Sequence, residues 1–377
     1  MIDEVTKAVL AREEVARYMR ASDDHIDRDA RERIFAYLDE LRTTQRYTIY
    51  RVLKHPLYPI LRKVERHVEH AEIVREATER GRVLYISNHK SHLDYLVEPL
   101  ALEDTHIRPP VIAAGINLFG GPLGLLHRHV TGAIPIRRDA RDPAYLATLK
   151  AYIAELLKRH DLMFYLEGGR SYTGEIKSPK TGLIHAALQA EGRDEMMIVP
   201  TAVSYDVVLE DGILARQGAK HRQRAFAREF TEMVGSAVGF ETRSFTTFGT
   251  PIPMKGWDPH ARRDVMALAH ATRDAIGRLY KVVPSAIVAV CVRPAMLRSE
   301  LRQRIADVVG RLDAAGANFD VKDPATIEER GVASLEARGV LVGERYRVRV
   351  RDRFVLRYYA RTLEHLLNPS RRTARSH

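Results

Sequence analysis

Short apolar runs alternate with longer helical patterns from about residue 81 onward, and this alternation constrains the fold more than any other feature. The helical patterns include SHLDYLVEPLALED, PAYLATLKAYIAELLKRH and TGLIHAALQA, and the apolar runs around them are RVLYIS, PPVIAAG, TGAIPI, LMFYLE and MMIVPTAVSY. Strands joined through helices pair in parallel, so the pattern predicts an α/β fold with a largely parallel sheet flanked by helices on both faces. Ligands bind beyond the carboxyl ends of the strands in such sheets, and the polar motifs of this chain follow its apolar runs.

Two further regions flank this core. We predict a helical region for residues 1–80. This region is rich in charged residues, and its apolar residues Ile34, Tyr37, Leu38 and Leu41 recur at helical spacing. Within it, we expect the basic and apolar residues 50–70 to form a helix packed on the core; the alternative is an amphipathic surface for membrane contact. Beyond the α/β domain (81–284), two helical patterns and the ribbon GERYRVRVRD predict a small helical, winged-helix-like accessory domain (285–377).

The chain carries an excess of positive charge. Its formal net charge is +11 and its isoelectric point is about 9.7, which favours an anionic partner such as a phosphorylated substrate, an acidic carrier protein, acidic lipid or nucleic acid. Cys291 is the only cysteine, which excludes an internal disulfide and a cysteine zinc site. The first twenty residues lack a signal-peptide core, and no apolar run is long enough to span a bilayer. We therefore expect a cytoplasmic protein that meets a membrane only at its surface.

The string SNHKSHLD follows the first apolar run and combines two histidines with an aspartate. Its Ser91-x-x-Asp94 fits a capping box, in which Ser91 is the N-cap of a helix and Asp94 is its third residue. On a continuous helix His89 and Asp94 would diverge by about 140°, but a turn into the helix lets them converge. A carboxylate there would fix the imidazole tautomer and raise its basicity, so His89 could act as a general base.

A metal site is the alternative interpretation of the same string. It would use His89, His92 and Asp94 as ligands. We do not favour it, because the turn breaks the helical register that both histidines need, and neither H-E-x-x-H nor a cysteine ligand set is present.

Three later motifs also follow apolar runs. GAIPIRR ends in Arg137 and Arg138, and arginine binds phosphate with a fork of donors. EGGRS comprises Glu167, Gly168, Gly169, Arg170 and Ser171, in which two glycines permit close approach of the backbone to a ligand; Lys180 follows. IVPTAVSY holds Pro200, which should stand at an edge, an end or a bulge of its strand. Each motif alone is also compatible with an ordinary turn or a solvated surface.

Together, in this order and at these distances, the four motifs resemble those of the glycerolipid acyltransferase family. The strings AAGINLFGGPLG and EGGRSYTGEIKSPKTG look like the bacterial membrane-associated glycerol-3-phosphate acyltransferase branch, which is related to the dihydroxyacetone-phosphate acyltransferases. The resemblance covers roughly residues 80–255 well. It is looser in the third region, where AMLRSELRQRI is similar.

The resemblance implies a role for each motif. His89 becomes the general base on the sn-1 hydroxyl of glycerol 3-phosphate and Asp94 its orienting partner. Arg138, with Arg137, binds the phosphate, and the EGGRS residues Glu167, Gly168, Gly169, Arg170 and Ser171 hold the glycerol phosphate from the other side. Pro200 helps to form the acyl-donor side. Separately from the resemblance, the charge of Lys180 makes it a further candidate for binding the phosphate. No metal or other cofactor is implied, because acyl-CoA or acyl carrier protein serves as co-substrate.

Other functions remain open at the level of sequence. The acceptor could be dihydroxyacetone phosphate or lysophosphatidate in place of glycerol 3-phosphate. A nucleic-acid-binding protein that uses RYRVRVRD as a wing is the alternative from a different class, although we expect no nucleic acid partner. The expected partners are glycerol 3-phosphate, the acyl donor and an anionic membrane surface, with the protein peripheral on the cytoplasmic face.

Overall fold

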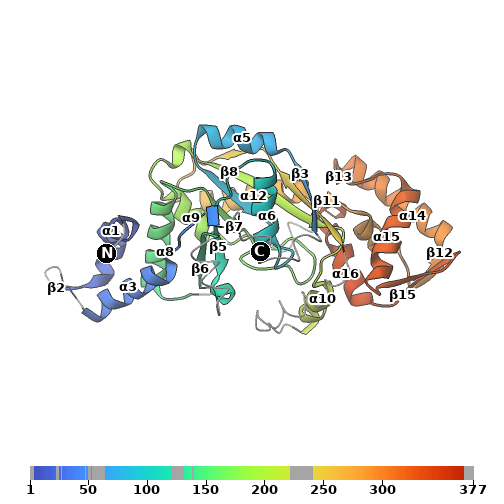
Figure 1. Cartoon of the computed structure of the whole chain (residues 1–377), viewed down its shortest axis with the longest axis horizontal. Coiled ribbons are helices and arrows are strands. Elements are labelled where there is room, and N and C mark those ends of the chain that lie inside the picture. The colour runs from blue at the N-terminus through green and yellow to red at the C-terminus, as the bar shows by residue number, and fades with distance from the viewer. Residues whose placement is uncertain are drawn as a thin grey trace.

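The computed structural model describes residues 4–22, 25–26, 28–46, 48–49, 52, 64–119, 131–137, 140–220 and 241–368. Its centre is an eight-stranded sheet of order β3-β9-β8-β4-β7-β5-β6, with β10 beside β8 (Figure 1). The strands are β3 (Val64–Glu69), β4 (Val83–Ser87), β5 (Val111–Gly115), β6 (Ala133–Ile136), β7 (Leu162–Tyr165), β8 (Met197–Tyr205), β9 (Thr242–Phe248) and β10 (Ile252–Pro253). All neighbours pair in parallel except that β8 is antiparallel to β9 and β10. The predicted α/β fold with a largely parallel sheet is confirmed.

Helices cover both faces of the sheet because successive strand residues alternate between two hydrophobic clusters. Leu84 and Ile86 face one cluster, whereas Val83 and Tyr85 face the other. On the first face lie α1 (Glu4–Ala11), α2 (Glu13–Ala16), α3 (Arg28–Leu41), α8 (Pro143–Leu156), α9 (Gly182–Leu188) and α12 (Arg262–Leu279). On the second face lie α5 (Ala71–Arg80) and α6 (Asp94–Asp104). The N-terminal helices therefore share the core of the sheet.

One prediction for the N-terminal region is wrong. Residues 64–69 form the edge strand β3, not the continuation of a helix, and the other residues of the 50–70 segment lie largely outside the described residues. Val64 and Val68 share one face of this strand, and β3 gains a full parallel ladder along β9. The predicted boundary at residue 80 thus separates β3 and α5 from the sheet on which they pack.

The C-terminal unit has the element order of a winged helix. It contains α13 (Pro284–Cys291), β12 (Ala295–Leu297), α14 (Arg298–Ala314), α15 (Pro324–Ala337), β14 (Leu341–Gly343) and β15 (Arg347–Val350), followed by α16 (Arg353–Arg361) and α17 (Glu364–Leu367). The predicted basic ribbon is the β14–β15 hairpin, which joins β12 in a three-stranded sheet at one end of the molecule (Figure 1). The unit shares a hydrophobic cluster with Val203 and Tyr205 of β8.

Smaller elements complete the described chain. They are η1 (Arg17–Met19), β1 (Arg20–Ser22), β2 (His25–Ile26), η3 (Ile116–Phe119), η4 (Arg193–Glu195), α10 (Asp211–Lys220), β11 (Lys281–Val282) and β13 (Asn318–Phe319). Among the helices within the described ranges, none combines the length and the apolar character needed to cross a bilayer.

Candidate active site

The turn that follows β4 brings His89 and Asp94 together. His89 Nδ1 lies 2.8 Å from Asp94 Oδ2, so the convergence predicted from the spacing is present. The helix begins differently from the prediction, because α6 starts at Asp94, two residues late, and Ser91 does not cap it. Instead, Ser91 Oγ accepts a hydrogen bond from the Leu93 amide at 3.0 Å. Asp94 Oδ2 accepts bonds from the amides of Lys90 at 2.6 Å and Ser91 at 3.0 Å.

Asp94 is held as an anion in a closed environment. Its side chain is fully buried, and its Oδ1 accepts a hydrogen bond of 2.7 Å from the Tyr205 hydroxyl. Burial raises the pKa of Asp94 to about 6, against the lowering effect of the hydrogen bonds from Ser91, Tyr205 and Lys90. At neutral pH the ionised carboxylate can only accept, so His89 Nδ1 carries the proton and Nε2 is the basic nitrogen of the ring.

Tyr165 and Glu98 are two further neighbours of the His89–Asp94 pair. The Tyr165 ring stacks on His89 with centroids 4.0 Å apart and planes 10° apart. Glu98 lies one turn beyond Asp94 on α6, fully buried, and accepts a 2.5 Å hydrogen bond from Ser87 Oγ. Burial, together with the nearby Asp94, raises the pKa of Glu98 well above its ordinary value. Burial therefore favours the protonated form of Glu98.

The EGGRS loop packs directly on the His89 turn. The Ser171 amide donates to the His89 carbonyl at 3.0 Å, and Ser171 Oγ donates to the Glu175 carbonyl at 2.6 Å. Gly168 has a φ of +66°, a conformation that favours glycine. Glu167 and Arg170 are both buried, and burial raises the pKa of Glu167. The loop thus brings buried charge to the turn that carries the base.

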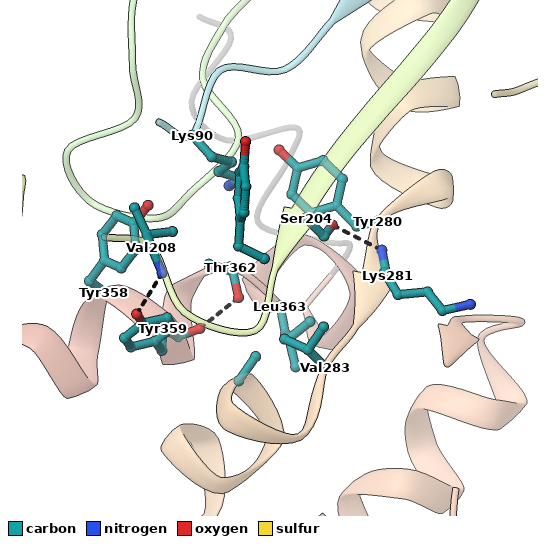
Figure 2. Close-up of a pocket in the computed structure, with 12 residues that line it drawn as sticks. Lys90, Ser204, Val208, Tyr280, Lys281, Val283, Tyr358, Tyr359, Thr362 and Leu363 are labelled. Carbon is teal, nitrogen blue, oxygen red and sulfur yellow. Dashed lines mark hydrogen bonds between the residues drawn. The ribbon is translucent and has the colours of Figure 1, made fainter. Parts of the chain in front are cut away.

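Lys90 leaves the same turn into a small pocket between the sheet and the C-terminal unit (Figure 2). Its Nζ donates to the Gly174 carbonyl at 2.8 Å and lies 4.6 Å from the centroid of the Tyr280 ring. Burial lowers the pKa of Lys90 to about 8. The pocket has a volume of ≈ 30 Å³, which is enough to hold a water molecule.

Sequence comparisons relate this chain to acyltransferases. A family model described as Acyltransferase matches residues 65–204. Three relatives carry the name glycerol-3-phosphate acyltransferase. The one from Histophilus somni is 36% identical over 207 residues, 52% of this chain and 25% of the relative. Those from Actinobacillus succinogenes and Aeromonas hydrophila are 35% and 32% identical over 60% of this chain, and 28% and 29% of their own lengths.

Residues 65–204 are thus similar in sequence to an acyltransferase domain. The matched region contains the His89 turn, the EGGRS loop and most of β8. The chain spans little more than a quarter of the length of these relatives. The substrates of these relatives can therefore only be proposed for this chain.

The other predicted residues of the acyltransferase motifs lie at varying distances from this turn. Arg137 stands at the end of β6. This strand is the third from β4 across the sheet, a separation of ~14 Å. Its guanidinium pairs with both oxygens of Glu40 at 2.8 and 2.6 Å, so its phosphate role stays a prediction. Arg138 lies outside the described residues. The Lys180 amide donates to the Leu166 carbonyl at 2.8 Å, and its side chain passes beside Gly168.

Pro200 lies within β8, where one side of that strand changes partner. β10 pairs with residues 197–198 and β9 with residues 201–205, so the proline falls between two ladders. Its carbonyl accepts from the Gly249 amide at 2.8 Å. The expected position at an edge, an end or a bulge is not found, because Pro200 stands inside the interior strand β8. The strand accommodates the proline at the gap between the β10 and β9 ladders.

The sequence motifs missed several residues that shape this site. Glu98, Tyr165, Tyr205 and Glu210 are examples, and only Tyr205 stood inside a motif. Glu98 could have been found from its place in the apolar run DYLVEPL. A carboxylate is rarely buried without a partner, so one inside a buried helix indicates a polar site. Glu210 gave no local signal, since its partners lie far away in the sequence. Within the described ranges, no group of three His, Cys, Asp or Glu side chains is arranged to hold a metal ion.

Proposed function

We propose that the chain transfers an acyl group from acyl-CoA or acyl carrier protein to the sn-1 hydroxyl of glycerol 3-phosphate, which gives lysophosphatidate. The observation that carries the proposal is the buried His89–Asp94 pair, with the EGGRS loop bonded to its turn, inside an acyltransferase domain. The names of the relatives support the choice of acceptor.

The geometry suits general-base catalysis of a thioester transfer. His89 Nε2 takes the proton of the acceptor hydroxyl as its oxygen adds to the thioester carbonyl. The tetrahedral oxyanion then collapses, the C–S bond breaks, and the thiolate takes the proton from the imidazolium. Asp94 stabilises that imidazolium through Nδ1. A positioned base of this kind contributes typically about 10²–10⁴-fold to a rate, and the reaction requires neither a metal nor a covalent enzyme intermediate.

The phosphate of the acceptor needs cations near this turn. Arg170 and Lys180 belong to the loop that packs on His89, and Arg137 and Arg138 follow the edge strand. We propose that Arg170 and Lys180 are the main phosphate contacts, because their loop packs against the turn that carries the base. Arg138 remains the candidate from the family pattern.

The charge of the whole chain supports anionic partners. A net charge of +11 raises the local concentration of glycerol 3-phosphate, of an anionic acyl donor and of acidic lipid. We propose that the protein acts at the cytoplasmic face of a membrane, without a nucleic acid partner. Sedimentation with anionic and with neutral vesicles tests the membrane part, and pelleting only with the anionic vesicles is the expected result.

The decisive experiment follows the release of free thiol. Purified protein is mixed with acyl-CoA or acyl carrier protein and, in separate arms, with glycerol 3-phosphate, dihydroxyacetone phosphate or lysophosphatidate. Acceptor-dependent release should be fastest with glycerol 3-phosphate and should fall by about 10²-fold or more in His89→Ala. His260→Ala, which alters an exposed histidine, is the matched control and should keep the wild-type rate. Absence of release with every acceptor and both donors would refute the proposal.

A further inference from the structure

We propose that Glu210 is a positioning residue that ties the base to the substrate loop, and that the C-terminal unit holds it in place. The inference rests on the proposed function for its kinetic consequences, but its structural part is independent. Glu210 lies beyond the end of β8, outside the four motifs, on the segment that leads into α10. Its side chain is buried, with 1% of the residue exposed.

The Glu210 carboxylate bridges two segments of the site. Its two oxygens accept from Ser91 Oγ at 3.0 and 2.8 Å, and Oε1 also accepts from the His92 amide at 2.6 Å. Arg170 Nη1 of the EGGRS loop lies 3.7 Å from the same Oε1. A buried anion with these partners is strongly oriented, because charge-assisted bonds gain strength away from water. One side chain thus fixes the turn behind His89 and the cation of the opposing loop.

The segment that carries Glu210 is itself held by the C-terminal unit. Arg338, just past α15, bonds to both oxygens of Asp211 at 2.5 and 3.2 Å and to the Leu209 carbonyl at 3.0 Å. The Tyr359 hydroxyl of α16 donates to Asp211 at 2.8 Å. It also accepts from the Val208 amide at 3.0 Å, the bond that Figure 2 shows. Both sides of Glu210 along the chain are therefore anchored by residues more than 120 positions later.

The same helix α16 also supports the segment that follows EGGRS. Gly174 has a φ of +87°, and an added Cβ would lie 2.1 Å from the Tyr358 carbonyl oxygen. Arg361 Nη1 lies 3.5 Å from Glu175 Oε1. Lys90, next to the base, donates to the Gly174 carbonyl at 2.8 Å. The two halves of the site thus meet on one C-terminal helix, so we infer that this unit is part of the site and not an independent appendage.

Kinetics separate positioning from stability through a matched pair of variants. Glu210→Gln keeps the shape but removes the charge that faces Arg170. Glu328→Gln does the same to a buried carboxylate bonded by Arg298 and Arg302 inside the C-terminal unit, away from this network. Small misplacements of reacting groups cost up to about 10²-fold in rate. We expect Glu210→Gln to lower kcat about 10–100-fold and to raise the KM for the acceptor, with the KM for the acyl donor unchanged.

The anchor is tested by Tyr359→Phe, which removes the hydroxyl that holds Asp211 and the Val208 amide. Tyr359→Phe should lower kcat, but by a smaller factor than Glu210→Gln does. Glu328→Gln should lower the melting temperature and leave kcat per folded molecule at the wild-type value. The inference is overturned if folded Glu210→Gln keeps kcat within twofold of wild type, or if Glu328→Gln lowers kcat as much.

A second readout does not depend on acyl transfer. The ¹⁵N shifts of the His89 imidazole report its bond to Asp94, and they can be followed by NMR in the full-length protein. We expect Glu210→Gln to move the His89 shifts and Glu328→Gln to leave them in place. Unchanged shifts in Glu210→Gln would contradict the positioning role. If the wild-type protein releases no thiol, the proposed function fails, while this measurement still decides the structural inference.

Discussion

Two buried carboxyl groups one helical turn apart differ in how far hydrogen bonds offset the cost of burying their charge. Burial raises the pKa of both, but Asp94 accepts bonds from two backbone amides and the Tyr205 hydroxyl, so its pKa reaches only about 6. Fewer hydrogen bonds offset the burial of Glu98, and its pKa rises well above the ordinary value. The hydrogen bonds therefore favour the anion at Asp94, beside the nitrogen that bears the proton of His89.

The pH profile of the proposed reaction should report this charge. The pKa of Asp94 is raised from 3.8 to about 6, so its ionised form dominates above pH 6 and is lost as the pH falls through that value. We expect kcat to fall about tenfold per pH unit below about 6. Rates measured between pH 4.5 and 8 check this; an activity that stays level down to pH 4.5 would show that the ionised Asp94 is not needed.

Glu98→Gln tests which carboxyl carries the charge. Glutamine resembles a protonated glutamate in shape and can still accept from Ser87 Oγ. If Glu98 is neutral, the substitution should leave kcat within about threefold and the acid limb near pH 6. If Glu98 is charged, its removal would lower the pKa of Asp94 and move the acid limb to lower pH. Glu98→Ala is the comparison for stability, since its cavity should lower the melting temperature.

At the scale of elements, local patterns predicted what local contacts determine. The five apolar runs became β4 to β8, because a strand covered by helices on both faces is apolar on both sides, and this is visible in the sequence as a continuous apolar run. The meeting of His89 with Asp94 followed from a turn of a few residues. β3 was missed because its partner β9 lies 178 positions away, and Glu210 because it meets Ser91 over 119 positions. Spacing in the sequence carries no record of such contacts.

Two glycines on helices of the C-terminal unit make a matched test of close packing. An added Cβ at Gly331 on α15 would lie 2.5 Å from the Pro284 carbonyl oxygen and 2.5 Å from Val288 on α13, whereas at Gly310 on α14 it would meet nothing within 4 Å. We expect Gly331→Ala to lower the free energy of unfolding by about 1–3 kcal/mol. Gly310→Ala should raise it by about 0.5–1 kcal/mol. Denaturant titrations measure both, and equal effects would contradict the packing of α13 on α15.

At the scale of the whole molecule, the C-terminal unit and the sheet share one hydrophobic cluster. Val203 and Tyr205 of β8 belong to the same cluster as Leu301 of α14 and Leu335 of α15. Elements that share a core open together, so we expect amides of α14 and α15 to exchange hydrogen with opening free energies within about 1 kcal/mol of those in β8. Native-state hydrogen exchange tests this. Markedly easier opening of α14 and α15 would indicate an independent domain.

The pairing of β3 with β9 also sets the order in which the sheet can be completed during synthesis. β3 leaves the ribosome 178 residues before its partner, which takes about 10–35 s at typical rates of translation. Glu69 at the end of β3 then bonds to Lys281 and Asn318, which are made later still. Until those residues emerge, the hydrogen-bonding groups of β3 have no native strand to pair with, and this edge of the nascent sheet is the segment that a chaperone would need to shield.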